Sequence, residues 1–152
     1  MNPFDLSNKV ICVTGASSGI GRQCAVSCSR MGATVVLLAR NEQRLHETLS
    51  IMDNPDKHVI IPVDLTEYAT VELVVKNIVS QVGRISGVLH CAGISTTLPL
   101  KLVTPEKLDE FFQANVFSAY NLTREVCKMG NFSKEGGSIV FFSSVMGKVG
   151  EN

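Results

Sequence analysis

Residues 9–21 read KVICVTGASSGIG, and this stretch decides the fold. A short apolar run suited to a β-strand leads into three closely spaced glycines, and apolar residues at helical spacing follow. Gly15 permits a tight turn off the strand, Gly19 leaves room for a phosphate against the backbone, and Gly21 allows helix and strand to pack closely. A helix that begins here directs free N–H groups and its positive dipole end at the turn. The stretch therefore predicts a strand, a phosphate-binding turn and a helix.

The residues that follow supply the context of this turn. Gly32 ends the predicted helix, and a second apolar run over residues 34–39 ends on Arg40. Strand, glycine turn, helix and strand in this order favour a nucleotide site over an ordinary glycine-rich turn, although βαβ units without nucleotides are common. The residues expected on the core face of the helix are Ile20, Cys24, Cys28 and Met31.

Helices and strands alternate along the rest of the chain. We expect three further helices, each starting at a capping residue: from Asn41 to about Met52, from Thr66 to Gly83, and from Thr104 to about Gly130. Strands are expected over residues 58–63, 87–91 and 138–142. Strict alternation demands a parallel sheet with helices on both faces. The sequence therefore predicts an α/β, doubly wound, Rossmann-like sheet in the order 3-2-1-4-5. Its ligand crevice would lie at the carboxyl ends of the strands, between strands 1 and 4.

Composition limits the class of protein. The chain has 152 residues, 45% hydrophobic and 18% charged, which are values of one globular domain over residues 1–152. Apolar runs are strand-sized and no signal peptide pattern opens the chain, so we expect neither a membrane span nor export. The formal net charge is zero without a basic block, so nucleic acid is not an expected partner. Five cysteines, an odd number, fit the reducing cytoplasm.

With Thr14 in front, the pattern Thr-Gly-x-x-x-Gly-x-Gly resembles the classical short-chain dehydrogenase/reductase family. The resemblance implies hydride transfer between a nicotinamide cofactor and a small-molecule carbonyl or secondary alcohol, with a 3-oxoacyl thioester as the first expectation. It also implies a homo-oligomer for the full-length protein. The cofactor-binding residues that it implies in the glycine turn are Gly15, Ser17, Ser18, Gly19, Ile20 and Gly21.

The end of the second strand bears on the choice of cofactor. A carboxylate at this point would bind the ribose 2′-hydroxyl of NAD, whereas Arg40 favours the 2′-phosphate of NADP, which a guanidinium can bind with two hydrogen bonds. Arg22 could add positive charge nearby. The alternative for Arg40 is a solvated surface arginine.

The resemblance assigns roles after the third and fourth strands. Asp64 would bind the adenine amino group and Leu65 would pack on the ring, while a helix cap is the plainer interpretation of Asp64. The family usually has Asn-Asn-Ala-Gly after the fourth strand, and here Ala92 and Gly93 match. His90 and Cys91 replace the two asparagines. Adjacent strand residues point to opposite faces, so we interpret this pair as packed residues and expect no metal site.

Two residues match the catalytic positions of the family. Asn115 is polar on an otherwise apolar helix face, and the resemblance makes it the asparagine whose backbone holds a water of the proton relay. Ser144 matches the serine that steadies the substrate carbonyl, with Ser143 as the alternative if the strand end shifts by one residue. The chain has two tyrosines, Tyr68 and Tyr120. Tyr120 precedes Arg124 by four positions, and we interpret it as a packing or interface residue.

The Tyr-x-x-x-Lys pair that gives the proton in this family has no counterpart in the sequence. The last predicted strand is also apolar on both faces, as expected of a strand with neighbours on both sides. We therefore expect a fold truncated before strands 6 and 7, and no catalysis by these 152 residues alone. The main alternative is a non-catalytic nucleotide-binding or assembly module. A methyltransferase is a weaker alternative, because it would need an acidic residue where Arg40 stands.

Overall fold

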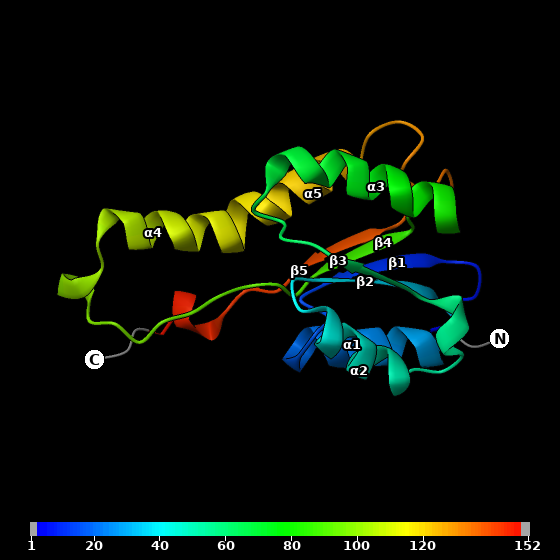
Figure 1. Cartoon of the computed structure of the whole chain (residues 1–152), viewed down its shortest axis with the longest axis horizontal. Coiled ribbons are helices and arrows are strands. Elements are labelled where there is room, and N and C mark those ends of the chain that lie inside the picture. The colour runs from blue at the N-terminus through cyan, green and yellow to red at the C-terminus, as the bar shows by residue number, and fades with distance from the viewer. Residues whose placement is uncertain (1–2, 150–152) are drawn as a thin grey trace.

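A five-stranded parallel sheet forms the centre of the computed structural model, which describes residues 3–149 (Figure 1). The strand order is β3-β2-β1-β4-β5, as the alternation of helices and strands predicts. Every neighbouring pair of strands is parallel, so all five carboxyl ends meet at one edge of the sheet. The strands are β1 (Val10–Thr14), β2 (Thr34–Ala39), β3 (Val59–Pro62), β4 (Gly87–His90) and β5 (Ser138–Phe141).

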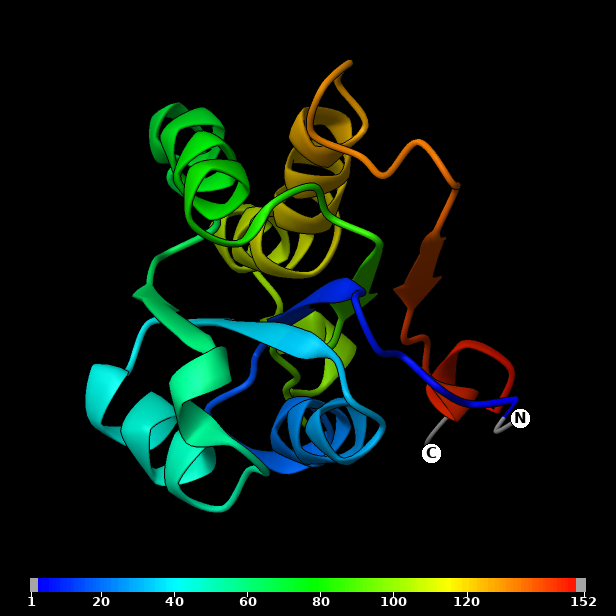
Figure 2. The ribbon, with the colours of Figure 1, turned by 90° about the vertical axis from the view of Figure 1, so that its right-hand side faces the viewer.

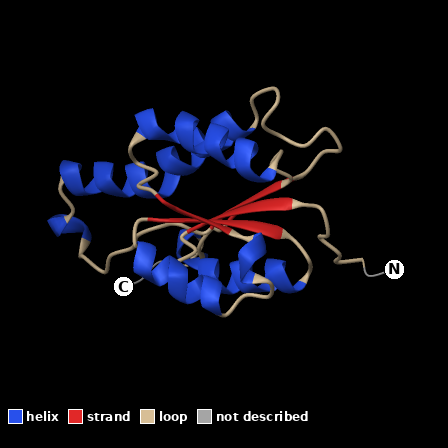
Figure 3. Cartoon of the chain, turned by 45° about the vertical axis from the view of Figure 1, so that its right-hand side comes forward, coloured by secondary structure: helices blue, strands red, loops and turns tan. Residues whose placement is uncertain are grey.

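Helices cover the sheet in two layers (Figures 1 and 3). On one face lie α1 (Gly19–Arg30) and α2 (Glu42–Ser50). On the other face lie α3 (Tyr68–Val82) and α5 (Ser118–Val126), while α4 (Pro105–Phe112) projects beyond the carboxyl ends of the strands. Short 3₁₀ turns complete the fold at η1 (Pro55–Lys57), η2 (Leu100–Leu102) and η4 (Val145–Gly147).

The sheet separates two apolar cores. Alternate strand residues such as Val13 and Leu37 pack with α1 and α2, whereas Cys12 and Leu38 pack with α3 and α5. Because side chains alternate across a strand, strands that are apolar throughout satisfy both cores. This arrangement confirms the interpretation of the continuous apolar runs.

The strand β5 differs from this pattern, because it lies at an edge of the sheet (Figure 2). Its apolar side chains are partly open to solvent, and Phe141 is 59% exposed. Within residues 3–149, β4 is the neighbour with which it pairs. An apolar sequence suited to an interior strand therefore stands at an open edge.

The predicted N-terminal caps of the helices agree with the structure in two cases and differ in one. Asn41 caps α2 by accepting a hydrogen bond from the Arg44 N–H, and Thr104 caps α4 in the same way. The prediction that Thr66 caps α3 is wrong, because that helix begins at Tyr68. The N–H and hydroxyl of Thr66 instead both donate to the Asp64 carboxylate, at 2.9 and 2.7 Å.

The core face of α1 is also rotated from its expected position. Ile20 is 60% exposed and Met31 is 38% exposed, while Cys24 and Cys28 are half-buried against the core. Other residues take the buried positions of this helix, and the first of them, Gly21, packs closely on the glycine turn. These residues are Gly21, Ala25, Val26 and Ser29.

The long helix expected after Thr104 contains an irregularity that the sequence pattern does not show. Between α4 and α5 lies one π-helical segment, η3 (Gln113–Phe117), with Asn115 at its centre. Such π-segments are rare inside helices and frequently occur at functional sites.

Candidate nucleotide-binding site

Each of the three glycines in residues 15–21 has a different structural role. Gly15 has a φ of +65°, and a Cβ there would lie 2.9 Å from the backbone N and Cα of Ala92. A Cβ on Gly21 would lie 2.3 Å from the Gly15 carbonyl oxygen, so helix and turn can approach only without a side chain. Gly19 has a φ of +51° and no atom within 4 Å of its missing Cβ. Two glycines thus serve packing, and the third leaves an open surface.

The turn is joined to the loop that follows β4. The Thr14 hydroxyl, which is buried, accepts a 3.0 Å hydrogen bond from the Ala92 N–H. Pairing of Thr14 with His90 brings the two loops together at the switch point between β1 and β4. The structural role of Thr14 cannot be inferred from the sequence alone, because it depends on this long-range pairing.

The first turn of α1 faces outward from this point. Ser18 has extended backbone geometry at the cap position, and its side chain makes no capping hydrogen bond to the helix. The first N–H groups of a helix lack intrahelical partners, so they and the helix dipole remain available to an anion. Ser18 and Ile20 are exposed beside these groups, and Ser17 is half-buried.

The ends of β2 and β3 place two charged residues near each other. Arg40 is exposed, and its charge contributes to the low pKa of Asp64. The largest cause of that low pKa is the hydrogen bond from the Thr66 hydroxyl, which stabilises the carboxylate. Leu65, expected to pack on an adenine ring, is only 8% exposed and belongs to the core beneath the α3 face.

Asn115 joins the π-segment to the loop after β4. Its side-chain oxygen accepts a 2.7 Å hydrogen bond from the Ile94 N–H, and its side-chain nitrogen donates to the Ile94 carbonyl at 2.9 Å. A Cβ on Gly93 would lie 3.0 Å from the same Asn115 oxygen, so the loop passes close to the amide. Direct contacts therefore connect the glycine turn, residues 92–94 and Asn115.

Ser144 lies outside this connected set. It follows β5 and caps η4, where its hydroxyl accepts a 3.2 Å hydrogen bond from the Met146 N–H. The last backbone link of this segment to β4 runs from the Phe142 N–H to the His90 carbonyl, at 3.4 Å. Ser143 and Ser144 are both exposed. The structure thus places the serine after the expected strand without bringing it into contact with Asn115.

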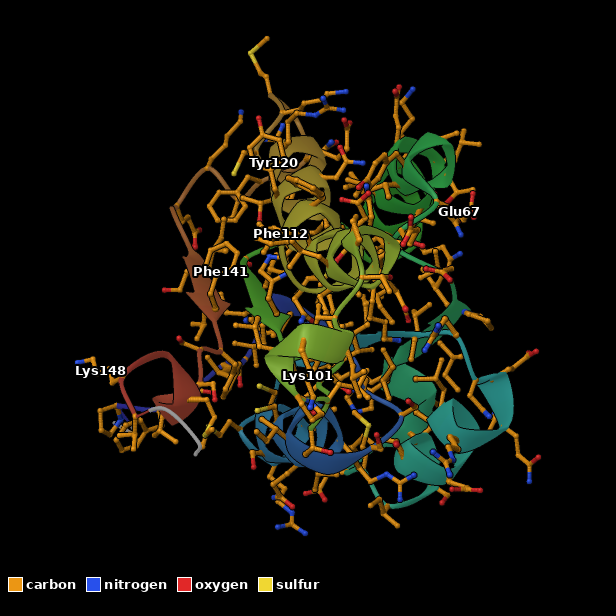
Figure 4. All side chains as sticks on the ribbon, turned by 90° about the vertical axis from the view of Figure 1, so that its left-hand side faces the viewer. Glu67, Lys101, Phe112, Tyr120, Phe141 and Lys148 are labelled. Atoms are coloured by element: carbon orange, nitrogen blue, oxygen red, sulfur yellow. The ribbon has the colours of Figure 1, made fainter. Side chains whose placement is uncertain are left out.

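Tyr120 does not accompany Ser144. It projects from α5 and is 64% exposed, on the side of the sheet opposite η4, the turn whose end is marked by Lys148 (Figures 1 and 4). Figure 4 shows Tyr120, Phe112 and Phe141 along the open side of the molecule beside β5. The exposure of Tyr120 shows that it does not pack within the described residues, and its role at an interface stays a prediction.

His90 and Cys91 point to opposite faces of the sheet, as expected. The Nε2 atom of His90 lies 2.9 Å from the Thr123 hydroxyl, and its ring stacks on Phe141 with centroids 4.6 Å apart. Burial lowers the pKa of His90 to about 4. Cys91 packs with Cys24 on the other face, and burial is the main cause that raises its pKa to about 12. No cluster of metal ligands occurs among residues 3–149.

Together, the doubly wound parallel sheet and the glycine turn at its switch point define the Rossmann-type fold of nucleotide-binding proteins. The model of the short chain dehydrogenase family matches residues 9–152. The chain belongs to this family.

Relatives and solved structures agree with the family. The chain is 33% identical to an uncharacterized oxidoreductase of Escherichia coli K12, over 95% of the chain and 59% of that protein. It is 30% identical to a 3-dehydrosphinganine reductase of Danio rerio, over 97% of the chain and 46% of that protein. The chain thus spans about half the length of these relatives.

Two solved structures show the same fold. A short chain dehydrogenase from Salmonella enterica has a TM-score of 0.85 and 35% identity, over 96% of the chain and 62% of that structure. An actinorhodin polyketide ketoreductase with NADPH has a TM-score of 0.86 and 27% identity, over 94% of the chain and 56% of that structure. No helix within residues 3–149 is both long enough and apolar enough to cross a membrane.

Proposed function

We propose that the chain supplies the cofactor-binding part of an NADP(H)-dependent oxidoreductase, which transfers hydride between nicotinamide and a carbonyl or secondary alcohol. The observation that carries the cofactor choice is Arg40, an exposed arginine at the carboxyl end of β2 and close enough to lower the Asp64 pKa. A guanidinium there can bind a 2′-phosphate, whereas an NAD-preferring site would carry a carboxylate. The ketoreductase structure that contains NADPH supports this choice.

The glycine turn would hold the pyrophosphate of the cofactor. Gly19 fits this role because the space beside it is open, so that a backbone can approach a phosphate there. Ser17, Ser18 and Ile20 would flank the phosphates, and Ala92 and Gly93 would line the path toward the nicotinamide. Asp64 would face the adenine amino group above the buried Leu65.

The nicotinamide supplies hydride transfer when it is bound, and the chain would orient the reacting groups. We assign Ser144 to the substrate oxygen, as a hydroxyl donor, and the Asn115 backbone to a water of the proton relay. The chain has no Tyr-x-x-x-Lys pair, so we propose that these residues alone do not complete the reaction. A ketone such as a 3-oxoacyl thioester is the substrate class that we propose for the whole protein, in line with the ketone named for the Danio rerio relative.

A second candidate function is a non-catalytic nucleotide-binding or assembly module. One observation favours it: neither Tyr68 nor Tyr120 is followed by a lysine four residues later. The open edge of β5 and the exposed Phe141 beside it would then serve association, and we propose a homo-oligomer for either function. The five cysteines are all free, which supports a cytoplasmic location.

Titration with NADPH and NADH tests the cofactor choice. We expect NADPH to bind more tightly, and Arg40→Ala to weaken it by about 1.5–3 kcal/mol, since a charge-assisted phosphate contact is lost. The same substitution should hardly change the affinity for NADH. Arg30→Ala, at the exposed far end of α1, is the matched control. Equal affinity of the unaltered protein for the two cofactors would refute the preference for NADP(H).

A further inference from the structure

The glycine turn is held from behind by two side chains whose roles the sequence pattern does not reveal. Thr48, on α2 and fully buried, places its hydroxyl 2.9 Å from the Ala16 carbonyl oxygen and 3.1 Å from the Arg44 carbonyl oxygen. Arg22, on α1, donates through Nη2 to the Ser17 carbonyl at 2.8 Å. Two successive carbonyl groups of the turn therefore have side-chain partners.

The two partners are also joined to each other. The Nε–H of Arg22 donates to the Thr48 hydroxyl at 3.0 Å, and Nη2 of Arg22 lies 3.2 Å from the Glu47 carboxylate. The hydroxyl thus accepts from Arg22 and donates to the turn. Arg22 is thus bound at once to Glu47, to Thr48 and to the Ser17 carbonyl.

The direction of the Ala16 and Ser17 carbonyls determines what the turn presents to a ligand. In a trans peptide the N–H points opposite to the C=O, and the described residues contain no cis peptide. With the Ala16 carbonyl held toward α2, the N–H of Ser17 points away from α2. A flip of the Ala16–Ser17 peptide would turn a carbonyl oxygen toward the place of the pyrophosphate, where two partial negative charges would repel. The peptide that follows closes the turn, because the Ser18 N–H donates to the Gly15 carbonyl at 3.5 Å.

We propose that Thr48 and Arg22 are positioning residues, through which α2 holds the glycine turn in the orientation that accepts a pyrophosphate. The proposal rests on the nucleotide-binding function proposed above. It assigns part of the affinity for the cofactor to residues that do not touch it. The binding energy of the pyrophosphate, and not that of the adenosine part, should depend on this pair.

Calorimetric titration of the whole chain with ADP and with adenosine 2′-monophosphate separates these contributions, because only ADP carries a pyrophosphate. We expect Thr48→Val and Arg22→Met each to weaken ADP binding by about 3- to 10-fold, since one hydrogen bond that orients the turn is lost. Binding of adenosine 2′-monophosphate should change less than twofold. Thr48→Ser, which keeps the hydroxyl, should retain the affinity for ADP.

Thr70→Val and Arg30→Met are matched controls, because both residues are exposed and lie outside the turn. In the double variant Thr48→Val/Arg22→Met, the fold-loss of ADP affinity should be smaller than the product of the two single losses, since the two side chains share a hydrogen bond. If circular dichroism shows that Thr48→Val does not fold, the ADP affinities of Arg22→Met and Thr48→Ser are compared instead.

The outcomes distinguish this proposal from the function on which it rests. If the unaltered chain binds ADP and the variants bind it equally well, the positioning role is refuted while nucleotide binding stands. Equal losses for ADP and adenosine 2′-monophosphate also refute it, because they indicate general damage. If the unaltered chain binds neither ligand, the nucleotide-binding function itself is refuted.

Discussion

The Thr14 hydroxyl accepts a 3.0 Å hydrogen bond from the N–H of Ala92, a residue 78 positions further along the chain. This bond ties the end of β1 to the loop after β4, and that loop is held in turn by Asn115 through Ile94. The glycine turn, residues 92–94 and the π-segment therefore form one connected unit. A substitution that disturbs one of these three segments should therefore also disturb the other two.

The Thr14–Ala92 bond provides the first prediction. Thr14→Val keeps the shape of the buried side chain and removes the acceptor, so we expect a loss of about 1 kcal/mol in the free energy of unfolding. Urea denaturation measures it, with Thr34→Val at the start of β2 as control. Unchanged stability would show that the Thr14–Ala92 hydrogen bond makes no net contribution to the stability of the fold.

Close packing at Gly21 provides the second prediction. The Cβ of Gly21→Ala would lie 2.3 Å from the Gly15 carbonyl oxygen. This atom belongs to the backbone, so it cannot move aside as the end of a flexible side chain could. We expect a loss of more than about 2 kcal/mol in the free energy of unfolding, with weaker nucleotide binding, because the turn must move. Gly147→Ala is the control, since nothing lies within 4 Å of its Cβ position. Equal thermal stability of the two variants would contradict the packing argument.

Buried histidines provide the third prediction, a loss of stability in mild acid. Burial lowers the pKa of His90 to about 4, and also lowers that of His58, whose Nδ1 accepts a 3.1 Å hydrogen bond from the Val35 N–H. Between pH 6.5 and pH 4 the His90 ring is protonated in the unfolded chain and mostly neutral in the folded chain. Stability is therefore present above pH 6.5 and is lost as the pH falls toward 4, by about 3 kcal/mol for His90.

Unfolding curves from pH 7 to pH 4 measure this loss, and His90→Asn should flatten the pH profile. His46→Gln, at an exposed position on α2, serves as the control variant. A profile as steep in His90→Asn as in the unaltered chain would assign the acid sensitivity to other groups, with His58 the first to test.

Catalytic incompetence of the chain is the fourth prediction. With NADPH and a reactive diketone we expect no absorbance loss above background, because Ser144 has no tyrosine and lysine pair to provide a proton. Tyr120 lies on the opposite side of the sheet from the turn that Ser144 caps (Figures 1 and 4). Measurable NADPH oxidation that Tyr120→Phe abolishes would reverse this conclusion.

Local patterns in the sequence carry most of the fold. The glycines at 15, 19 and 21 and the strictly alternating elements predict the strand order, because connections between parallel strands are short and of one hand. The caps Asn41 and Thr104 are also predicted, since a cap bonds only three residues away. Thr66 fails as a cap because the nearer carboxylate of Asp64 competes for its N–H and hydroxyl.

Other parts of the site depend on residues far apart in the chain. Thr48 and Arg22 are separated by 26 positions, and His90 and Thr123 by 33, so no spacing in the sequence points to their contacts. The π-segment around Asn115 is likewise absent from the apolar pattern, which reads as one regular helix.

By itself the sequence determined the sheet, its order and the position of the glycine turn, because steric limits on glycine and side-chain periodicity act over a few residues. Only the tertiary structure decided which side chains hold that turn and which faces of α1 and β5 meet solvent. Those outcomes depend on close packing between elements whose positions the local pattern does not specify.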